Sequence, residues 1–292
     1  MVTSFRAGFV MTWKRTWFVS ILLLVYTSIA VWLYFNKDFD LSIIGIIFSS
    51  ILFTALSLFL AFRTNSAYER WWEARKAWGA ILNDNRSLVR QLVSFTNGKE
   101  SDMVELMCRR QILWNYTFTA KLRQIEISDM ARDYRILSPG SANDSQTLLN
   151  QQGQDIQKLA DKGIINQYQQ MTLENTLMKL TDSMGVCERI KNTVFPVSYI
   201  LFTMILLIIL VAFGPFAMAE DLNYMAIPVN LIIGYSFYVI ESIGFALQDP
   251  FSNSPTDTPM LAISRTAEKD ILMSLRKEEL PELLQAKAGV LM

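Results

Sequence analysis

Residues 41–62 read LSIIGIIFSSILFTALSLFLAF, and none of these 22 side chains is ionisable. At about 1.5 Å per residue, a helix of this length spans about 33 Å, which is enough to cross a hydrocarbon core of about 30 Å. The charged, tryptophan-rich stretch RTNSAYERWWEARKAWG follows directly at residues 63–79. The pattern predicts a membrane-spanning helix that leads into a helical region outside the bilayer.

Three further stretches lack Asp, Glu, Lys and Arg over a comparable length, at Trp17–Phe35, Val194–Ala219 and Leu222–Ile240. Core helices of soluble proteins rarely exceed about 14 apolar residues, so four such stretches predict four membrane spans. We expect the first to be retained rather than cleaved as a signal peptide, because no small-residue cleavage zone follows Ala30.

The charges that flank the four predicted spans indicate their orientation. One set of flanks is rich in Lys and Arg, and the opposite loops are mostly acidic. The basic residues are Arg6, Lys14, Arg15, Arg63, Arg70, Arg75, Lys76, Arg189 and Lys191, and the opposite loops carry Lys37, Asp38, Asp40, Glu220 and Asp221. By the positive-inside rule, both termini and the long middle region are expected in the cytoplasm.

The remaining sequence is predicted to be helical, so the fold class is all-α. Helical patterns cover Tyr68–Phe95, Ser101 to about Arg135, Ser145–Lys162, Asn166–Asn192 and Pro259–Leu275, and Ser101, Asp102 and Glu105 suggest a capping box. We expect residues 1–62 to hold the first two spans, 63–193 a cytoplasmic helical region, 194–247 the last two spans and 248–292 a cytoplasmic C-terminal segment.

The composition argues against several classes of protein. Lys+Arg and Asp+Glu number 27 each, whereas a nucleic-acid-binding domain normally carries a positive excess. The chain has no histidine, which excludes His-based catalytic triads and His-ligated metal sites. Its two cysteines cannot form a four-thiolate site. Cys187, close to Arg189, is either an activated thiol or, as we expect, a packing residue. Nothing indicates an enzyme, a metal or a cofactor.

One face of the second span is part polar and part apolar. Its members are Ile47, Ser50, Ile51, Thr54, Ser57, Leu58, Ala61 and Phe62. Thr54 and Ser57 can donate hydrogen bonds to the carbonyl four residues back, so this face does not need water. Helix packing and pore lining both remain open. A ring of copies around this face would make a narrow tube with an apolar constriction that can gate by dewetting.

Residues 58–79, LFLAFRTNSAYERWWEARKAWG, resemble the bestrophin family, above all its bacterial members. The family carries a similar FLGFRN and then EARKxWG, and the triplet RWW at residues 70–72 is similar to that of animal bestrophins. Cys187-Glu188-Arg189-Ile190 with Pro196 resembles the entry to the family's third span, and Asp249-Pro250-Phe251 the segment after its fourth. The resemblance extends over nearly the whole chain.

The resemblance implies a homopentameric ion channel with one central pore in a bacterial inner membrane. The family's neck residues correspond to Thr54, Leu58 and Phe62, which recur every four residues on the face described above, with Ser50 and Ser57 as further pore-lining candidates. Thr54 stands where the family has Ile or Val, which implies a wider or more hydrated outer end.

A second constriction of the family, the cytoplasmic aperture, corresponds to Tyr168 or Gln169, neither of which is the usual small aliphatic residue. Animal bestrophins are calcium-gated chloride channels with an acidic cluster after the Pro-Phe motif. Here residues 252–257, SNSPTD, offer only the carboxylate of Asp257, whereas calcium takes six or more oxygen ligands. We therefore expect no calcium gating.

The sequence indicates the ion selectivity less directly, because the neck candidates are uncharged. Bacterial relatives resemble cation channels, and acidic residues in the outer loops would concentrate cations at a pore mouth if they faced it. The expectation is a channel for monovalent cations such as sodium, with identical subunits and the lipid bilayer as partners and no nucleic acid. The alternatives are an anion (chloride) channel of the same fold and, less favoured, a non-conducting four-span scaffold.

Overall fold

The computed structural model describes residues 1–36, 46–135, 144–193 and 195–291, without the side chains of residues 46–49. These residues are almost entirely helical, and the only β-structure among them is isolated bridges that join Val290 to Val2 and Lys287. The all-α prediction is confirmed for this part of the chain. The chain divides into two compact units, an apolar unit (residues 4–70 and 194–248) and a polar unit (residues 1–3, 71–193 and 249–292).

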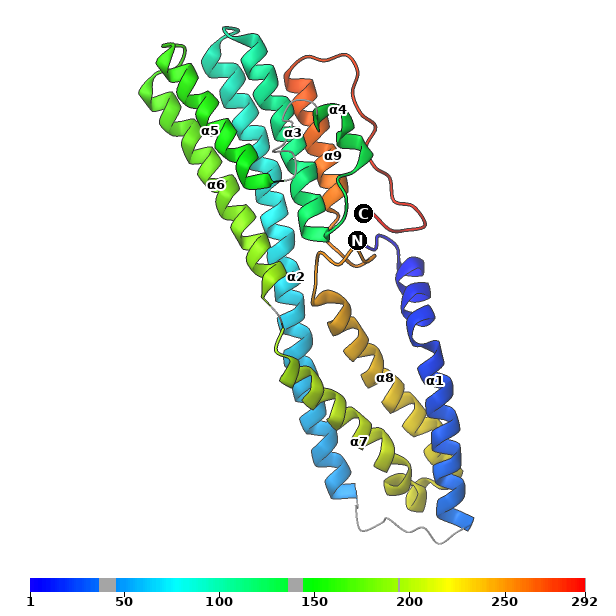
Figure 1. The fold of residues 1–292 in the computed structure, drawn as a ribbon. Helices are drawn as coiled ribbons and strands as arrows, with labels where there is room; N and C mark the ends of the chain where they lie inside the picture. Colours follow the sequence, from blue (N-terminus) through cyan, green and yellow to red (C-terminus); the bar gives the residue numbers. More distant parts are fainter. Residues whose placement is uncertain (37–45, 136–143, 194, 292) are drawn as a thin grey trace. The chain divides into compact units, whose positions relative to one another are not determined.

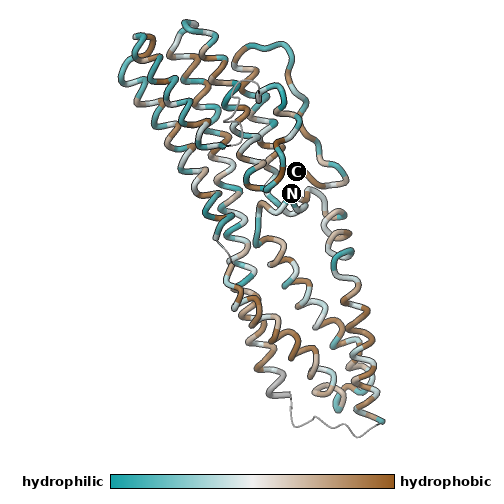
Figure 2. The backbone as a smooth tube through the Cα atoms, viewed as in Figure 1, coloured by the Kyte–Doolittle hydropathy of each residue, from teal (hydrophilic) through white to brown (hydrophobic). Residues whose placement is uncertain are grey.

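The apolar unit contains four helical segments. They are α1 (Phe5–Asn36), the first part of α2 (Ile46–Thr96), α7 (Val197–Leu222) and α8 (Ala226–Leu247). Helix α1 packs against α7 and α8, and α7 packs against α8 (Figure 1). Figure 2 shows hydrophobic residues along these helices, with few hydrophilic positions between them. Many of their large apolar side chains are exposed, among them Phe18, Ile51 and Ile208, so the unit is apolar on its outside as well as between its helices.

Three helical stretches of the described residues are long and apolar enough to cross a membrane: Phe5–Asn36, Ser50–Thr96 and Val197–Leu247. The third has 51 residues, far more than the roughly 20 that one crossing needs. A 3-10 turn at Asn223–Met225 divides it into α7 and α8, which pack against each other.

Helix α2 joins the apolar unit through one side. Leu56 and Leu60 are buried against Leu207 and Leu210 of α7 and Phe237 of α8. The same helix continues without a break to Thr96, so the predicted second span and the tryptophan-rich helix after it are one helix of 51 residues. The polar unit begins within this helix, beyond the predicted boundary at residue 62.

The polar unit is a bundle around a large core. Its helices are the end of α2, α3 (Ser101–Arg123), α4 (Arg132–Arg135), α5 (Ser145–Asp161), α6 (Gln167–Asn192) and α9 (Met260–Ser274). Trp78 of α2 and Trp114 of α3 both stack on Phe118, with ring centroids 5.7 and 5.4 Å apart. These side chains are fully buried, which makes them a main part of the core.

Two details of helix α3 differ from the sequence prediction. It ends at Arg123 rather than near Arg135, because Gln124 adopts a left-handed conformation (φ 55°) and its N–H bonds back to the last turn. The predicted capping box is absent, since Glu100 precedes the helix with φ 51° and no side chain caps it. By contrast, Asn166 and Gln169 form a complete capping box at the start of α6.

A buried polar network links three helices of this unit. Asn85 of α2 donates to Asn115 of α3 (2.8 Å) and accepts from Gln111 (2.6 Å). Arg110 of α3 pairs with Asp155 of α5 at 2.7 Å, and each side chain is 7% exposed. Burial alone would raise the pKa of Asp155, but hydrogen bonds from Lys158 and Arg110 outweigh it and hold the pKa below its usual value. The network fixes the register of α2, α3 and α5.

Replacing Asp155 by Asn should destabilise the protein, because Arg110 stays buried without its carboxylate. Breaking such a pair costs about 3–5 kcal/mol, so the midpoint of thermal unfolding in detergent should fall at neutral pH. The folded pKa of Asp155 lies below the unfolded value of about 3.9. Its contribution is therefore complete above that value and is lost as the pH falls through the folded pKa, so the gap between Asp155→Asn and wild type should close in acid.

The matched control is Asp129→Asn, which removes an ion pair with Arg132 whose side chains are 90% and 75% exposed. An exposed pair contributes about 0–1 kcal/mol, so the unfolding midpoint should hardly move. Equal losses in the two variants, or a gap that persists in strong acid, would contradict the assignment.

Candidate functional site

The groups that usually carry enzyme chemistry are not gathered in the described residues. No three His, Cys, Asp or Glu side chains in this part of the chain group closely enough to hold a metal ion. Both Cys108 and Cys187 are fully buried, and burial raises the pKa of each thiol to about 12. A thiol with such a pKa is almost entirely protonated at neutral pH. Cys187 is thus a packing residue, as expected.

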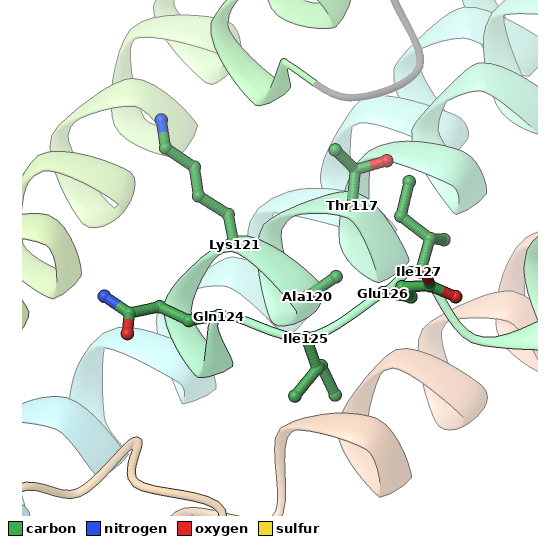
Figure 3. Close-up of a pocket in the computed structure, with 7 residues that line it drawn as sticks. All are labelled: Thr117, Ala120, Lys121, Gln124, Ile125, Glu126 and Ile127. Atoms are coloured by element: carbon green, nitrogen blue, oxygen red, sulfur yellow. The ribbon is translucent and has the colours of Figure 1, made fainter.

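A cavity of about 600 Å³ lies at the end of α3 (Figure 3). Thr117, Ala120, Lys121, Gln124, Ile125, Glu126 and Ile127 line it. Lys121 and Glu126 point to different sides of it, and Lys121 forms an ion pair with Glu188 at 2.8 Å. The cavity therefore has no pair of side chains arranged for acid–base or nucleophilic work.

In the loop after α8, the carboxylate of Asp257 accepts hydrogen bonds from donors of the same loop. Asp257 is buried and accepts from the hydroxyls of Ser252 (3.2 Å) and Ser254 (2.9 Å) and from the N–H of Asn253 (2.6 Å). Burial raises the pKa of this carboxyl, and the hydrogen bonds oppose the rise. The single carboxylate of this loop is thus already bonded by donors within the loop.

The neck candidates lie on the exposed side of α2 in the apolar unit. Leu58 is 54% exposed and Phe62 60%, and Ser50 and Thr54 are exposed as well, whereas Ser57 is half-buried. Together they form a face that no other described helix of the same unit covers. We call Ser50, Thr54, Leu58 and Phe62 the exposed face of α2.

The hydroxyl groups near this face bond to their own helix. Thr54 Oγ1 donates to the carbonyl of Ser50 at 2.9 Å, and Ser57 Oγ donates to that of Phe53 at 2.7 Å. This confirms the predicted bonds to the carbonyl four residues back. The face can therefore border an apolar medium, another protein surface or a water-filled space without an unsatisfied hydroxyl donor.

The opposite side of α2 is buried and contains a charge. Leu56, Leu60, Arg63 and Ala67 are each at most 2% exposed. Arg63 forms an ion pair with Glu241 of α8, and the two side chains are 1% and 7% exposed. Within one turn, α2 thus changes from the exposed Phe62 to the buried Arg63.

Sequence reasoning missed this pair. From the sequence, Arg63 is expected to be a basic flank of the second span, and the fourth stretch without ionisable residues ends at Ile240, directly before Glu241. In the structure Arg63 is buried, and α8 carries Glu241 on its buried side and ends at Leu247, where the predicted region of the last two spans also ends. A signal was present: two apolar runs end on single charges of opposite sign, as partners in a low-dielectric interior would.

The aperture candidates lie in the polar unit, at the start of α6. Tyr168 is 79% exposed, whereas the Gln169 side chain accepts from the N–H of Asn166 at 2.9 Å as part of the capping box. Only Tyr168 of the two has a side chain that projects into solvent. Of the outer acidic residues, Glu220 and Asp221 are exposed near the end of α7, and Asp38 and Asp40 lie outside the described residues.

Comparisons with known proteins agree on one family. The family model for bacterial and fungal bestrophin proteins matches residues 11–273. A voltage-dependent anion channel-forming protein of Nostoc sp. is 32% identical over 237 residues, which is 78% of this chain and 76% of the relative. The protein of the same name from Escherichia coli K12 is 29% identical over 239 residues, 80% of this chain and 77% of the relative.

Solved structures show the same likeness. The crystal structure of a bacterial bestrophin homologue from Klebsiella pneumoniae superimposes with a TM-score of 0.81 at 26% sequence identity. The superposition covers 90% of this chain and 99% of the Klebsiella chain. The similarity therefore includes both units of the chain.

Proposed function

The chain belongs to the bacterial and fungal bestrophin family of ion channels, and we propose that identical copies of it assemble around the exposed face of α2 into a pore that conducts anions. The family match carries this proposal. It is supported by the geometry of α2, which is buried on one side within its own subunit and exposed on the other, as a helix that lines a shared axis must be.

The proposed subunit crosses a bacterial inner membrane four times, with both termini in the cytoplasm. Helices α1, α2, α7 and α8 make the crossings. The turn at Asn223–Met225 lets the stretch Val197–Leu247 cross twice, once as α7 and once as α8. The polar unit and the C-terminal segment then form the cytoplasmic region. Five copies, as the family resemblance implies, would bring five such faces to one axis.

The proposed neck consists of Thr54, Leu58 and Phe62 from each subunit, with Ser50 at its outer side. Its hydroxyls bond to their own helix, so an ion in the neck meets mainly apolar side chains and must be at least partly dehydrated. Ser57, half-buried, lies at the edge of this surface. Tyr168 is the proposed aperture residue, because the side chain of Gln169 is used in the helix cap.

The choice of anions departs from the expectation drawn from the sequence. The named relatives are anion channel-forming proteins, and at 32% and 29% identity they are similar enough to favour the anion alternative. One observation supports the alternative that the channel conducts cations. Glu220 and Asp221 are exposed near the C-terminal end of α7, where the helix dipole adds further negative potential.

Reversal potentials test the selectivity. With purified protein in a planar bilayer under a potassium chloride gradient, the reversal potential should move toward the chloride equilibrium potential. A shift toward the potassium potential would replace the anion proposal by the cation alternative, and neutralising Glu220 and Asp221 should then weaken that shift. Absence of any current, with correctly assembled protein, would favour a non-conducting scaffold.

Shortening Leu58 should widen the neck. Leu58→Ala removes an exposed apolar side chain from every subunit, so the current through a single open channel should rise. The matched control is Leu56→Ala two residues away, which empties a buried site and should lower stability by about 2–5 kcal/mol while leaving current per channel unchanged. If Leu58→Ala only reduced the amount of stable protein, Leu58 would be a packing residue.

Calcium should not gate this channel. The loop after α8 offers one carboxylate, Asp257, and three internal donors already bond to its oxygens. A calcium site of six or more oxygens would need further acidic ligands. Open probability in bilayers should therefore be the same in added calcium and in a calcium chelator, and a dependence on calcium would refute this part of the proposal.

A further inference from the structure

We infer that the buried ion pair between Arg63 and Glu241 is a positioning device that fixes the rotation of α2 and thereby the direction in which the neck side chains point. The inference rests on the proposed function, because it gives a role to a pair that lies behind the proposed neck. Neither residue belongs to the exposed face of α2, so the pair acts through the helix rather than on the ion.

Stability alone does not account for the pair. Arg63 and Glu241 sit almost entirely out of solvent in the apolar unit, at 1% and 7% side-chain exposure. Removing two charges from water is costly, and well-packed apolar residues at such positions are often as stabilising or more so. A chain that needed only cohesion between α2 and α8 could use the leucine contacts found one and two turns away.

The position of the pair along α2 connects it to the neck. Arg63 directly follows Phe62, and successive helical residues point about 100° apart. Phe62 is 60% exposed while Arg63 is 2% exposed. Where Arg63 is held therefore determines where Phe62 points, and a rotation of α2 by about 100° would turn Phe62 to the buried side that Arg63 now occupies.

The other contacts of α2 are less able to fix its rotation. Leu56 and Leu60 pack against leucines and Phe237, and dispersion and hydrophobic contacts carry little directional preference. A guanidinium and a carboxylate, by contrast, prefer a defined planar geometry. In this pair Arg63 Nη1 faces Glu241 Oε1, while Arg63 Nη2 and Glu241 Oε2 have no hydrogen-bond partner within the described residues, so the attraction of the two charges is what holds these side chains toward each other.

The pair also lies where α2 and α8 approach closely. Gly244 is three residues after Glu241 on α8, and a Cβ added there would lie 3.5 Å from Thr64 Oγ1 and 3.9 Å from Thr64 Cα. These are ordinary van der Waals distances, so at this level the two backbones lie only about one small side chain apart. At such a short separation, a small change in the pair would be passed on to α2 rather than absorbed by intervening side chains.

The experiment replaces the pair in three ways in the full-length protein. Glu241→Gln keeps the shape but leaves Arg63 unpaired. The double variant Arg63→Met/Glu241→Leu substitutes an apolar pair, and Arg63→Glu/Glu241→Arg reverses the charges. The readout is the rate at which a charged, water-soluble thiol reagent modifies Phe62→Cys, measured by mass. The native cysteines are buried and give little background.

We expect Phe62→Cys to react readily when the native pair is intact and severalfold more slowly with the apolar double variant, even where its thermal stability equals or exceeds that of wild type. Single-channel conductance should change in the same variant, and the charge-reversed pair should restore both readouts at least in part. Asp182→Cys, at an exposed site of the polar unit, is the control and should react equally in all backgrounds.

Three results would overturn the inference or its premise, and they are distinguishable. A stable apolar double variant with unchanged labelling and conductance would reduce the pair to a packing contact. A Phe62→Cys protein that is not labelled even with the native pair, and that passes no current, would instead remove the pore on which the inference rests. Glu241→Gln that only lowers the yield of folded protein, with labelling per folded molecule unchanged, would also count against positioning.

Discussion

The structure depends on one constraint: polar groups inside the apolar unit must find their partners within the protein. Hydroxyls meet it locally, since Thr27 and Thr54 donate to carbonyls four residues back in their own helices. A charge cannot be neutralised in this way, because the backbone carbonyls of a helix carry no full counter-charge. Arg63 therefore needs a second helix, and Glu241 of α8 supplies the carboxylate. This pair ties α2 to the rest of the unit.

The same requirement is met differently in the polar unit. There the buried polar groups form an extended network in which amides and the Arg110–Asp155 pair satisfy one another across α2, α3 and α5. Aromatic stacking around Phe118 fills the adjacent core. Helix α2 belongs to both units, so one continuous element carries the proposed neck at one end and core residues of the bundle at the other.

This arrangement gives a physical account of a channel without charged groups at its proposed neck. The exposed face of α2 is apolar at Leu58 and Phe62 and bears hydroxyls at Ser50 and Thr54, of which Thr54 bonds to its own helix, so it can act as a barrier to hydrated ions. The sign of the permeating ion must then depend on groups outside the neck. Charge near the neck does occur, but it lies behind the helix in a neutralised pair, where it positions side chains rather than attracting ions.

Features that depend on neighbouring residues along the chain can be predicted from local sequence patterns. Apolar runs, helical periodicity and the motif at residues 58–79 were enough for the all-α class, for most helix positions and for the bestrophin family, and the face of Ser50, Thr54, Leu58 and Phe62 follows from the helical repeat alone. The early end of α3 at Arg123 was not predictable, because a left-handed Gln124 has no distinctive signature in sequence. The opposite signs of Arg63 and Glu241 at the ends of two apolar runs are compatible with a pair, but it is the packing of α2 beside α8 that makes them buried partners. Whether a charge at the end of an apolar run meets water or a counter-ion depends on which distant helix packs beside it, and that information is not contained in either run.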